Sequence, residues 1–195
     1  MYSASKVAQM AAFFGQRQGG VINVLKLTKL LYLSDRESLG RFGHPISYDS
    51  MVSLDNGPVL SRTLNLTNGF VGGAEGAKWD EWITDRSNHD VRVKRTFTRE
   101  ELNELSDADL DVLETVWRQF GGMDQWTLSG WTHTNCPEWK DPHGSSLPID
   151  EEALLRHLGV PPEAARALAL KIISERKLDR LFSRLERPAH AARSS

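Results

Sequence analysis

Apolar residues recur at intervals of three and four along two segments near the N-terminus. This spacing predicts amphipathic helices over residues 3–18 and 23–39, because a helix turns once in about 3.6 residues. Asn23 is a favourable N-cap for the second helix, and glycines follow each segment, where they end a helix at little cost. The apolar stripes contain Val7, Met10, Ala11, Phe14, Leu27, Leu30, Leu31 and Leu33.

The next stretch changes to a period of two, which is typical of extended chain. Residues 45–54 place apolar side chains at even positions, and residues 55–57 read Asp-Asn-Gly, a turn sequence. Pro58 then suits the first position of a helix, which we expect to run to about residue 68. The glycine-rich residues 69–76 are predicted to be a mobile loop.

Residues 79–85 and 90–97 resemble two strands joined by the turn at residues 86–88. In a strand Trp79 and Trp82 point to opposite faces, so we expect one of them to be exposed. An exposed tryptophan is a common anchor in protein interfaces.

The C-terminal half predicts helices over residues 106–120, 124–133, 150–159 and 161–186, with Ser106, Asp124 and Asp150 as caps. The expected fold class is therefore α+β, mainly α: a compact helical domain with a small antiparallel β-hairpin or sheet. We expect this domain to span residues 1–160. A C-terminal amphipathic helix, 161–187, packs on it or extends it, and a disordered tail covers 188–195.

Composition narrows the function classes. The formal net charge is −2, without the basic excess of a general nucleic-acid binder. The single cysteine, Cys136, cannot form an internal disulfide, which fits a reducing compartment. We expect neither a secretory leader nor a membrane-spanning helix, because the N-terminal residues do not read as a signal peptide and no stretch approaches about 18 apolar residues. We therefore expect a soluble cytoplasmic protein that contacts neither membrane nor nucleic acid.

Candidate chemistry is sparse. His133 and Cys136 are close enough in sequence for a Cys/His hydrolase, but no catalytic signature surrounds them and a lone cysteine usually packs as a small apolar residue. The six histidines are scattered, which disfavours zinc. Asp107, Asp109 and Asp111 fit the first turns of a helix better than an acid cluster. The glycine-rich loop lacks the Gly-Lys-Ser/Thr of a phosphate loop. No catalytic residue, metal or cofactor is expected.

Three sequence blocks together resemble a known family. The first is Lys26-Leu27-Thr28-Lys29-Leu30-Leu31-Tyr32-Leu33-Ser34-Asp35-Arg36 with Gly43-His44-Pro45-Ile46; the second is Asn56-Gly57-Pro58-Val59; the third is Leu128-Ser129, Thr132-His133, Pro137 and Trp139. In this order they are similar to the Panacea domain family, which includes SocA-like antitoxins and phage-associated proteins. The resemblance covers residues 5–158. Its motif residues here are Lys29, Asp35, Arg36, Asn56, Gly57, Pro58, Val59, Thr132, His133 and Trp139.

The resemblance implies a bacterial antitoxin that neutralises a protein toxin by direct binding. One alternative is a proteolytic adaptor of the SocA kind, which delivers the toxin to the ClpXP protease through ClpX. Others are a phage protein with no cognate toxin and the Cys136/His133 hydrolase. Many members carry an added helix-turn-helix; we expect none here, and therefore no transcriptional autoregulation. The segment after Val59 has Leu64 nearby where an aromatic residue is expected. The motif residues also have plain structural roles: turn, core and loop packing.

Two surfaces are candidates for partner binding. The first is the expected hairpin over residues 79–97, with Trp82, Arg92 and Lys94 as contact residues. The second is the basic C-terminal helix, represented by Arg180 and Arg184, which would serve the protease in the adaptor hypothesis.

Overall fold

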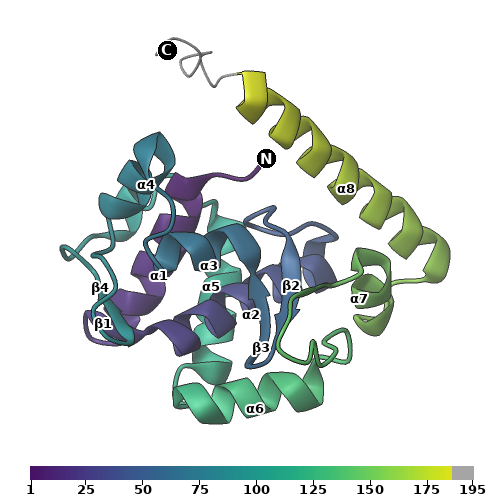
Figure 1. Cartoon of the computed structure of the whole chain (residues 1–195), viewed down its shortest axis with the longest axis horizontal. Coiled ribbons are helices and arrows are strands. Elements are labelled where there is room, and N and C mark those ends of the chain that lie inside the picture. The colour runs from purple at the N-terminus through teal and green to yellow at the C-terminus, as the bar shows by residue number, and fades with distance from the viewer. Residues whose placement is uncertain (186–195) are drawn as a thin grey trace, which may run out of the picture.

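The computed structural model describes residues 1–185; the side chains of Arg180 and of residues 183–185 lie outside this description, as does the predicted tail over 188–195. The described chain is mostly helical, with two small antiparallel sheets (Figure 1). The predicted class, α+β and mainly α, is confirmed.

The helix α2 (Val24–Phe42) lies at the centre of the fold. The Asn23 side chain accepts a hydrogen bond from the backbone N–H of Leu25 at 3.0 Å, and Gly43 ends the helix with a φ of 74°. These are the cap and stop that the sequence predicts. Around α2 pack α1 (Ala4–Arg17), α5 (Asp107–Phe120) and α6 (Gln125–Asn135) (Figure 1). Leu27, Leu30, Leu31 and Tyr32 of α2 are fully buried among them.

A three-stranded sheet covers one side of α2, in the order β3-β2-β5, with β2 (Met51–Leu54), β3 (Gly57–Leu60) and β5 (Leu147–Pro148). The prediction that Pro58 starts a helix is wrong, because Pro58 lies in β3 opposite Ser53. A proline is tolerated there since β3 is an edge strand and its missing N–H breaks no ladder. The helix begins later, as α3 (Ser61–Thr67).

The predicted hairpin over residues 79–97 is confirmed in part. Residues 79–80 belong instead to the helix α4 (Gly73–Asp80), which also replaces part of the predicted glycine loop. Beyond α4 the two halves do pair antiparallel: bridges join Ile83 with Val93 and Ser87 with Asp90, and backbone hydrogen bonds of 2.9 Å join residues 84 with 92 and 94 with 82. The strand β4 (Asp90–Arg92) also pairs with β1 (Val21–Asn23). Trp79 and Trp82 are both buried, so the expectation of one exposed tryptophan here is wrong.

The C-terminal part contains a short turn η1 (Arg99–Glu101) before α5 and ends with α7 (Glu151–His157) and α8 (Pro162–Leu185). The long helix α8 starts beside α7 and runs along the outside of the molecule (Figure 1). The domain boundary at residue 160 stays a prediction. Across residues 1–185, no helix is long and apolar enough to cross a bilayer.

Candidate functional site

The tip of the β2–β3 hairpin is fitted tightly between α2 and α6. Gly57 adopts a φ of +100°, which strains any residue with a side chain. A Cβ added at Gly57 would lie 2.7 Å from Thr132 Oγ1, 3.1 Å from Lys29 Nζ and 3.2 Å from His133 Cδ2. Four motif residues from three distant segments of the sequence therefore meet at one point, and glycine is required there for both conformation and space.

Lys29 lies fully buried beneath this tip. Its ammonium group Nζ donates a hydrogen bond to the carbonyl oxygen of Pro58 at 2.9 Å. Because β3 is an edge strand, this bond satisfies a backbone acceptor that has no strand beside it. Burial lowers the pKa of Lys29 to about 7, so a large part of the population carries a neutral amine at neutral pH.

A second set of contacts holds the hairpin tip from the α6 side. The His133 and Trp139 rings stack at a centroid distance of 4.2 Å, and Trp139 Nε1 donates to the carbonyl oxygen of Leu54 at 2.9 Å. Ser129 Oγ donates to the carbonyl oxygen of Asn56 at 2.7 Å. His133 Nε2 is buried without a hydrogen-bond partner, and burial, with nearby Lys29 second, lowers the pKa of His133.

The motif residues Asp35 and Arg36 on α2 each bind a loop segment through their charged side chains. Asp35 is buried and accepts from the N–H groups of Ile46 and Ser47 at 3.0 and 2.9 Å, and from the Ser47 hydroxyl. Burial raises the pKa of Asp35 to about 6. Arg36 Nε forms an ion pair with Glu138 Oε1 at 2.7 Å.

The buried partner of Arg36 is a residue that sequence reasoning missed. Glu138 also accepts a hydrogen bond from the Tyr32 hydroxyl, so two side chains of α2 meet one carboxylate. The only sequence clue was its position between Pro137 and the motif residue Trp139. Asp35, Arg36 and their partners thus fix loops around α2, as expected of structural motif residues.

The hydrolase hypothesis fits this geometry poorly. Cys136 is fully buried at the end of α6, and burial raises the pKa of its thiol to about 12. A nucleophilic cysteine needs the opposite environment, one that favours the thiolate. In the part of the chain that the structure describes, no three His, Cys, Asp or Glu side chains are grouped as metal ligands.

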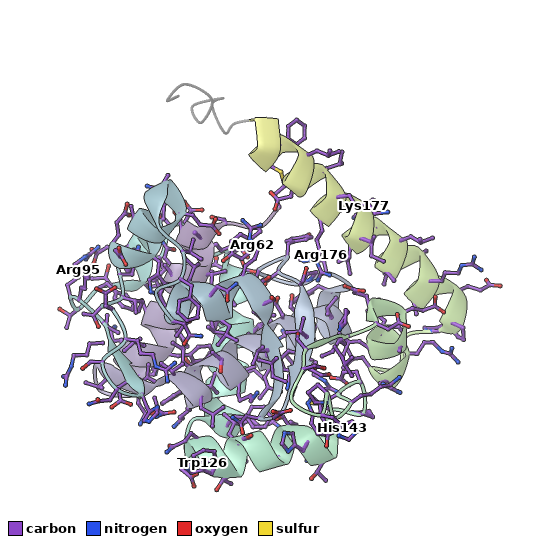
Figure 2. The ribbon with its side chains drawn as sticks, viewed as in Figure 1. Arg62, Arg95, Trp126, His143, Arg176 and Lys177 are labelled. Carbon is purple, nitrogen blue, oxygen red and sulfur yellow. The ribbon has the colours of Figure 1, made fainter. Side chains whose placement is uncertain are left out.

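A cleft of about 700 Å³ opens beside the hairpin tip. Its lining includes the motif residues Lys29, Asn56 and Val59, together with Arg86 and His89 from the loop before β4. Trp126, in the first turn of α6, stands at its edge with 65 % of its surface exposed (Figure 2). An apolar floor with polar groups and an exposed tryptophan can bind a protein segment or small ligand.

The predicted contact residues differ in how much surface they expose. Trp82 is buried against Phe97 and can offer little surface, whereas Arg92 and Lys94 are exposed. Lys94 donates to the carbonyl oxygen of Asp80, which leaves Arg92 as the more available cation. Arg180 and Arg184 lie on α8, but their side chains fall outside the described residues. Trp126 is one of six tryptophans in the chain, and nothing in the neighbouring sequence indicates that it is exposed.

Comparison with known proteins gives one match. The family model described as "Antitoxin SocA-like, Panacea domain" matches residues 27–140, more than half of the chain. This range includes all ten motif residues named above. No curated protein and no solved structure matches.

Proposed function

Because the chain belongs to the SocA-like antitoxin, Panacea domain family, we propose that it is the antitoxin of a bacterial toxin–antitoxin pair and neutralises its protein toxin by direct binding. The binding surface is the cleft beside the hairpin tip. The observation that carries this choice is that buried motif residues build the cleft wall while Asn56 and Trp126 remain exposed at it.

The architecture explains how such a site is pre-organised for binding. The hairpin tip is fixed by Gly57, by Lys29 and by the stacked rings of His133 and Trp139. The cleft wall therefore loses little conformational entropy when a partner binds. Arg86 and His89 add polar groups on one side, and Arg92 follows on β4. The proposed surface therefore extends from Trp126 to Arg92 and includes part of the surface expected from sequence.

Trp126→Ala is expected to weaken toxin binding by about 2 kcal/mol, or about 30-fold in Kd, because an exposed tryptophan at the edge of a cleft is a typical binding hot spot. Co-expression with the toxin and measurement of growth and Kd test this. Phe42→Ala is the matched control. Phe42 is an exposed aromatic residue at the C-terminal end of α2, whereas the cleft lies at the N-terminal end of that helix. Unchanged neutralisation by Trp126→Ala and by the Arg92→Glu, Lys94→Glu double variant excludes this surface.

A proteolytic adaptor is the second candidate function, because α8 presents an additional outward apolar face that could contact a second protein such as ClpX. The same co-expression distinguishes the two if toxin abundance is also followed. A neutraliser leaves the toxin level unchanged, whereas an adaptor lowers it, and Leu178→Ser with Leu181→Ser on the outward face of α8 then restores the toxin level without loss of toxin binding.

A further inference from the structure

The inner face of α8 is anchored to the body of the protein. Ala165, Ala169 and Ile172 are buried against it. Arg176 forms an ion pair with Glu151 of α7, and its Nε donates to the carbonyl oxygen of Tyr48 at 3.2 Å. These contacts account for one side of the helix.

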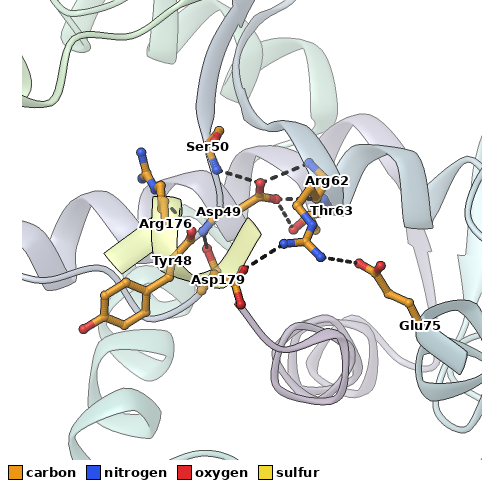
Figure 3. A network of polar contacts seen from close by, with 9 residues as sticks. Tyr48, Asp49, Ser50, Arg62, Thr63, Glu75, Arg176 and Asp179 are labelled. Atoms are coloured by element: carbon orange, nitrogen blue, oxygen red, sulfur yellow. Dashed lines mark hydrogen bonds and ion pairs between the residues drawn. The ribbon is translucent and has the colours of Figure 1, made fainter. Parts of the chain in front are cut away.

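A polar network extends this anchor toward the C-terminus of α8 (Figure 3). The Arg62 guanidinium lies between Asp179 of α8 and Glu75 of α4, with both N–O distances at 3.1 Å. Asp49 fixes the start of α3 by accepting from the N–H groups of Arg62 and Thr63 at 3.1 and 2.8 Å. The orientation of α8 is therefore set as far as Asp179, and so is the direction of its outer face.

The outer face carries a second apolar stripe that the fold does not use. Leu170, Leu178, Leu181 and Phe182 are each more than half exposed, at 57 %, 51 %, 55 % and 54 %. Residues eleven apart, such as Leu170 and Leu181, lie on the same side of a helix, and Leu178 and Phe182 are one turn apart. Clustered exposed apolar side chains of this kind mark interaction sites more often than single ones do.

One flank of the stripe is basic. Arg166 and Lys177 are exposed and also eleven residues apart, so they follow the same side of the helix next to Leu170 and Leu181. An incoming apolar surface would therefore meet positive charge along this edge. Electrostatic complementarity favours a partner with acidic side chains there.

We propose that the outer face of α8 docks an amphipathic helix of a protein partner whose apolar ridge is flanked by acidic side chains. A second copy of this chain fits less well, because an antiparallel pair about a two-fold axis sets the Arg166–Lys177 flank against itself. A membrane surface also fits less well, since the net charge of −2 provides no long-range attraction to anionic lipid.

This surface is separate from the cleft. Trp126 on α6 and Lys177 on α8 lie on opposite sides of the molecule (Figure 2). The docking proposal does not depend on the toxin site, and a partner on α8 leaves the cleft open.

The test uses the full chain and two synthetic helical peptides of about 21 residues, long enough to form helix. Both carry the same leucine ridge; one is flanked by glutamates and the other by lysines. We expect the Glu-flanked peptide to bind at least about tenfold tighter, as measured by fluorescence anisotropy. The double variant Arg166→Glu, Lys177→Glu should invert this preference, because the sign of the flank is reversed.

Leu178→Ser with Leu181→Ser should remove peptide binding while the thermal midpoint stays unchanged, since both side chains are exposed. Phe70→Ser is the matched control, an exposed apolar residue that belongs neither to α8 nor to the cleft lining, and should bind as wild type. Equal binding of the two peptides, or binding of neither, overturns the proposal. So does sedimentation of the chain with anionic vesicles, or a dimer that the leucine substitutions dissociate, because each assigns the face to another occupant.

Discussion

Replacing Gly57 with alanine is expected to lower the free energy of unfolding by about 3 kcal/mol and the thermal midpoint by about 10 °C. Two effects add up at this position. The backbone φ of +100° strains an alanine, and the new Cβ would lie 2.7 Å from Thr132 Oγ1. Thermal and urea unfolding followed by circular dichroism measure the loss.

Gly144→Ala separates the two effects. Gly144 also has a positive φ, +79°, but nothing lies within 4 Å of an added Cβ, so only backbone strain is introduced. We expect the Gly57 substitution to cost at least twice as much. Adding Thr132→Ala should recover part of the difference, because the removed hydroxyl relieves the crowding. Equal losses at Gly57 and Gly144 would contradict the tight fit of the hairpin tip.

The unfolding free energy is expected to rise by about 1.5 kcal/mol between pH 7 and pH 8.5 because of Lys29. The folded-state pKa of Lys29, about 7, lies below the ordinary value of 10.5. In this window the unfolded chain holds a proton that the folded chain has released, so raising the pH favours the folded state. Below about pH 7 the folded chain holds the proton as well, so the slope disappears and this gain in stability is absent.

Urea unfolding at pH 7.0, 7.5, 8.0 and 8.5 measures this slope. Lys29→Met should remove it, and Lys171→Met, a substitution of an exposed lysine, should leave it intact. The window stops at pH 8.5 because the thiol of Cys136 begins to ionise in the unfolded chain near that pH. A slope that survives in Lys29→Met assigns the pH dependence to another group and removes the basis for a neutral amine under the hairpin.

Helices were predicted well because their causes are local. The cap at Asn23 and the stop at Gly43 lie within a few residues of the apolar stripe of α2, so the sequence contains the whole explanation. The same holds for the Ser106 cap of α5 and the Asp124 cap of α6.

Strands were predicted less well because their partners are distant. Residues 90–97 do alternate in polarity and pair with the adjacent segment as expected, but β4 also pairs with β1 near the N-terminus, which the local pattern does not indicate. The fixed φ of Pro58 is compatible both with the first turn of a helix and with an edge strand. The pairing of Pro58 with Ser53, which is not visible in the local sequence, selects the strand.

The candidate site was predicted in part. The resemblance identified the motif residues, but the meeting of Gly57, Lys29, Thr132 and His133 is a tertiary fact that spacing alone does not reveal. Burial of Trp82 and exposure of Trp126 could not be separated in the sequence, since both are tryptophans beside polar residues. Trp126, not the expected Trp82, is therefore the exposed tryptophan beside the candidate site.

The most direct test of the antitoxin proposal is affinity purification of the tagged chain from its native host at native expression, with partners quantified by mass spectrometry. The proposal predicts one abundant protein near equal stoichiometry that arrests growth when expressed alone and is depleted from the Trp126→Ala eluate but retained by Phe42→Ala. The absence of any stoichiometric partner, or a partner that is not toxic, would contradict it.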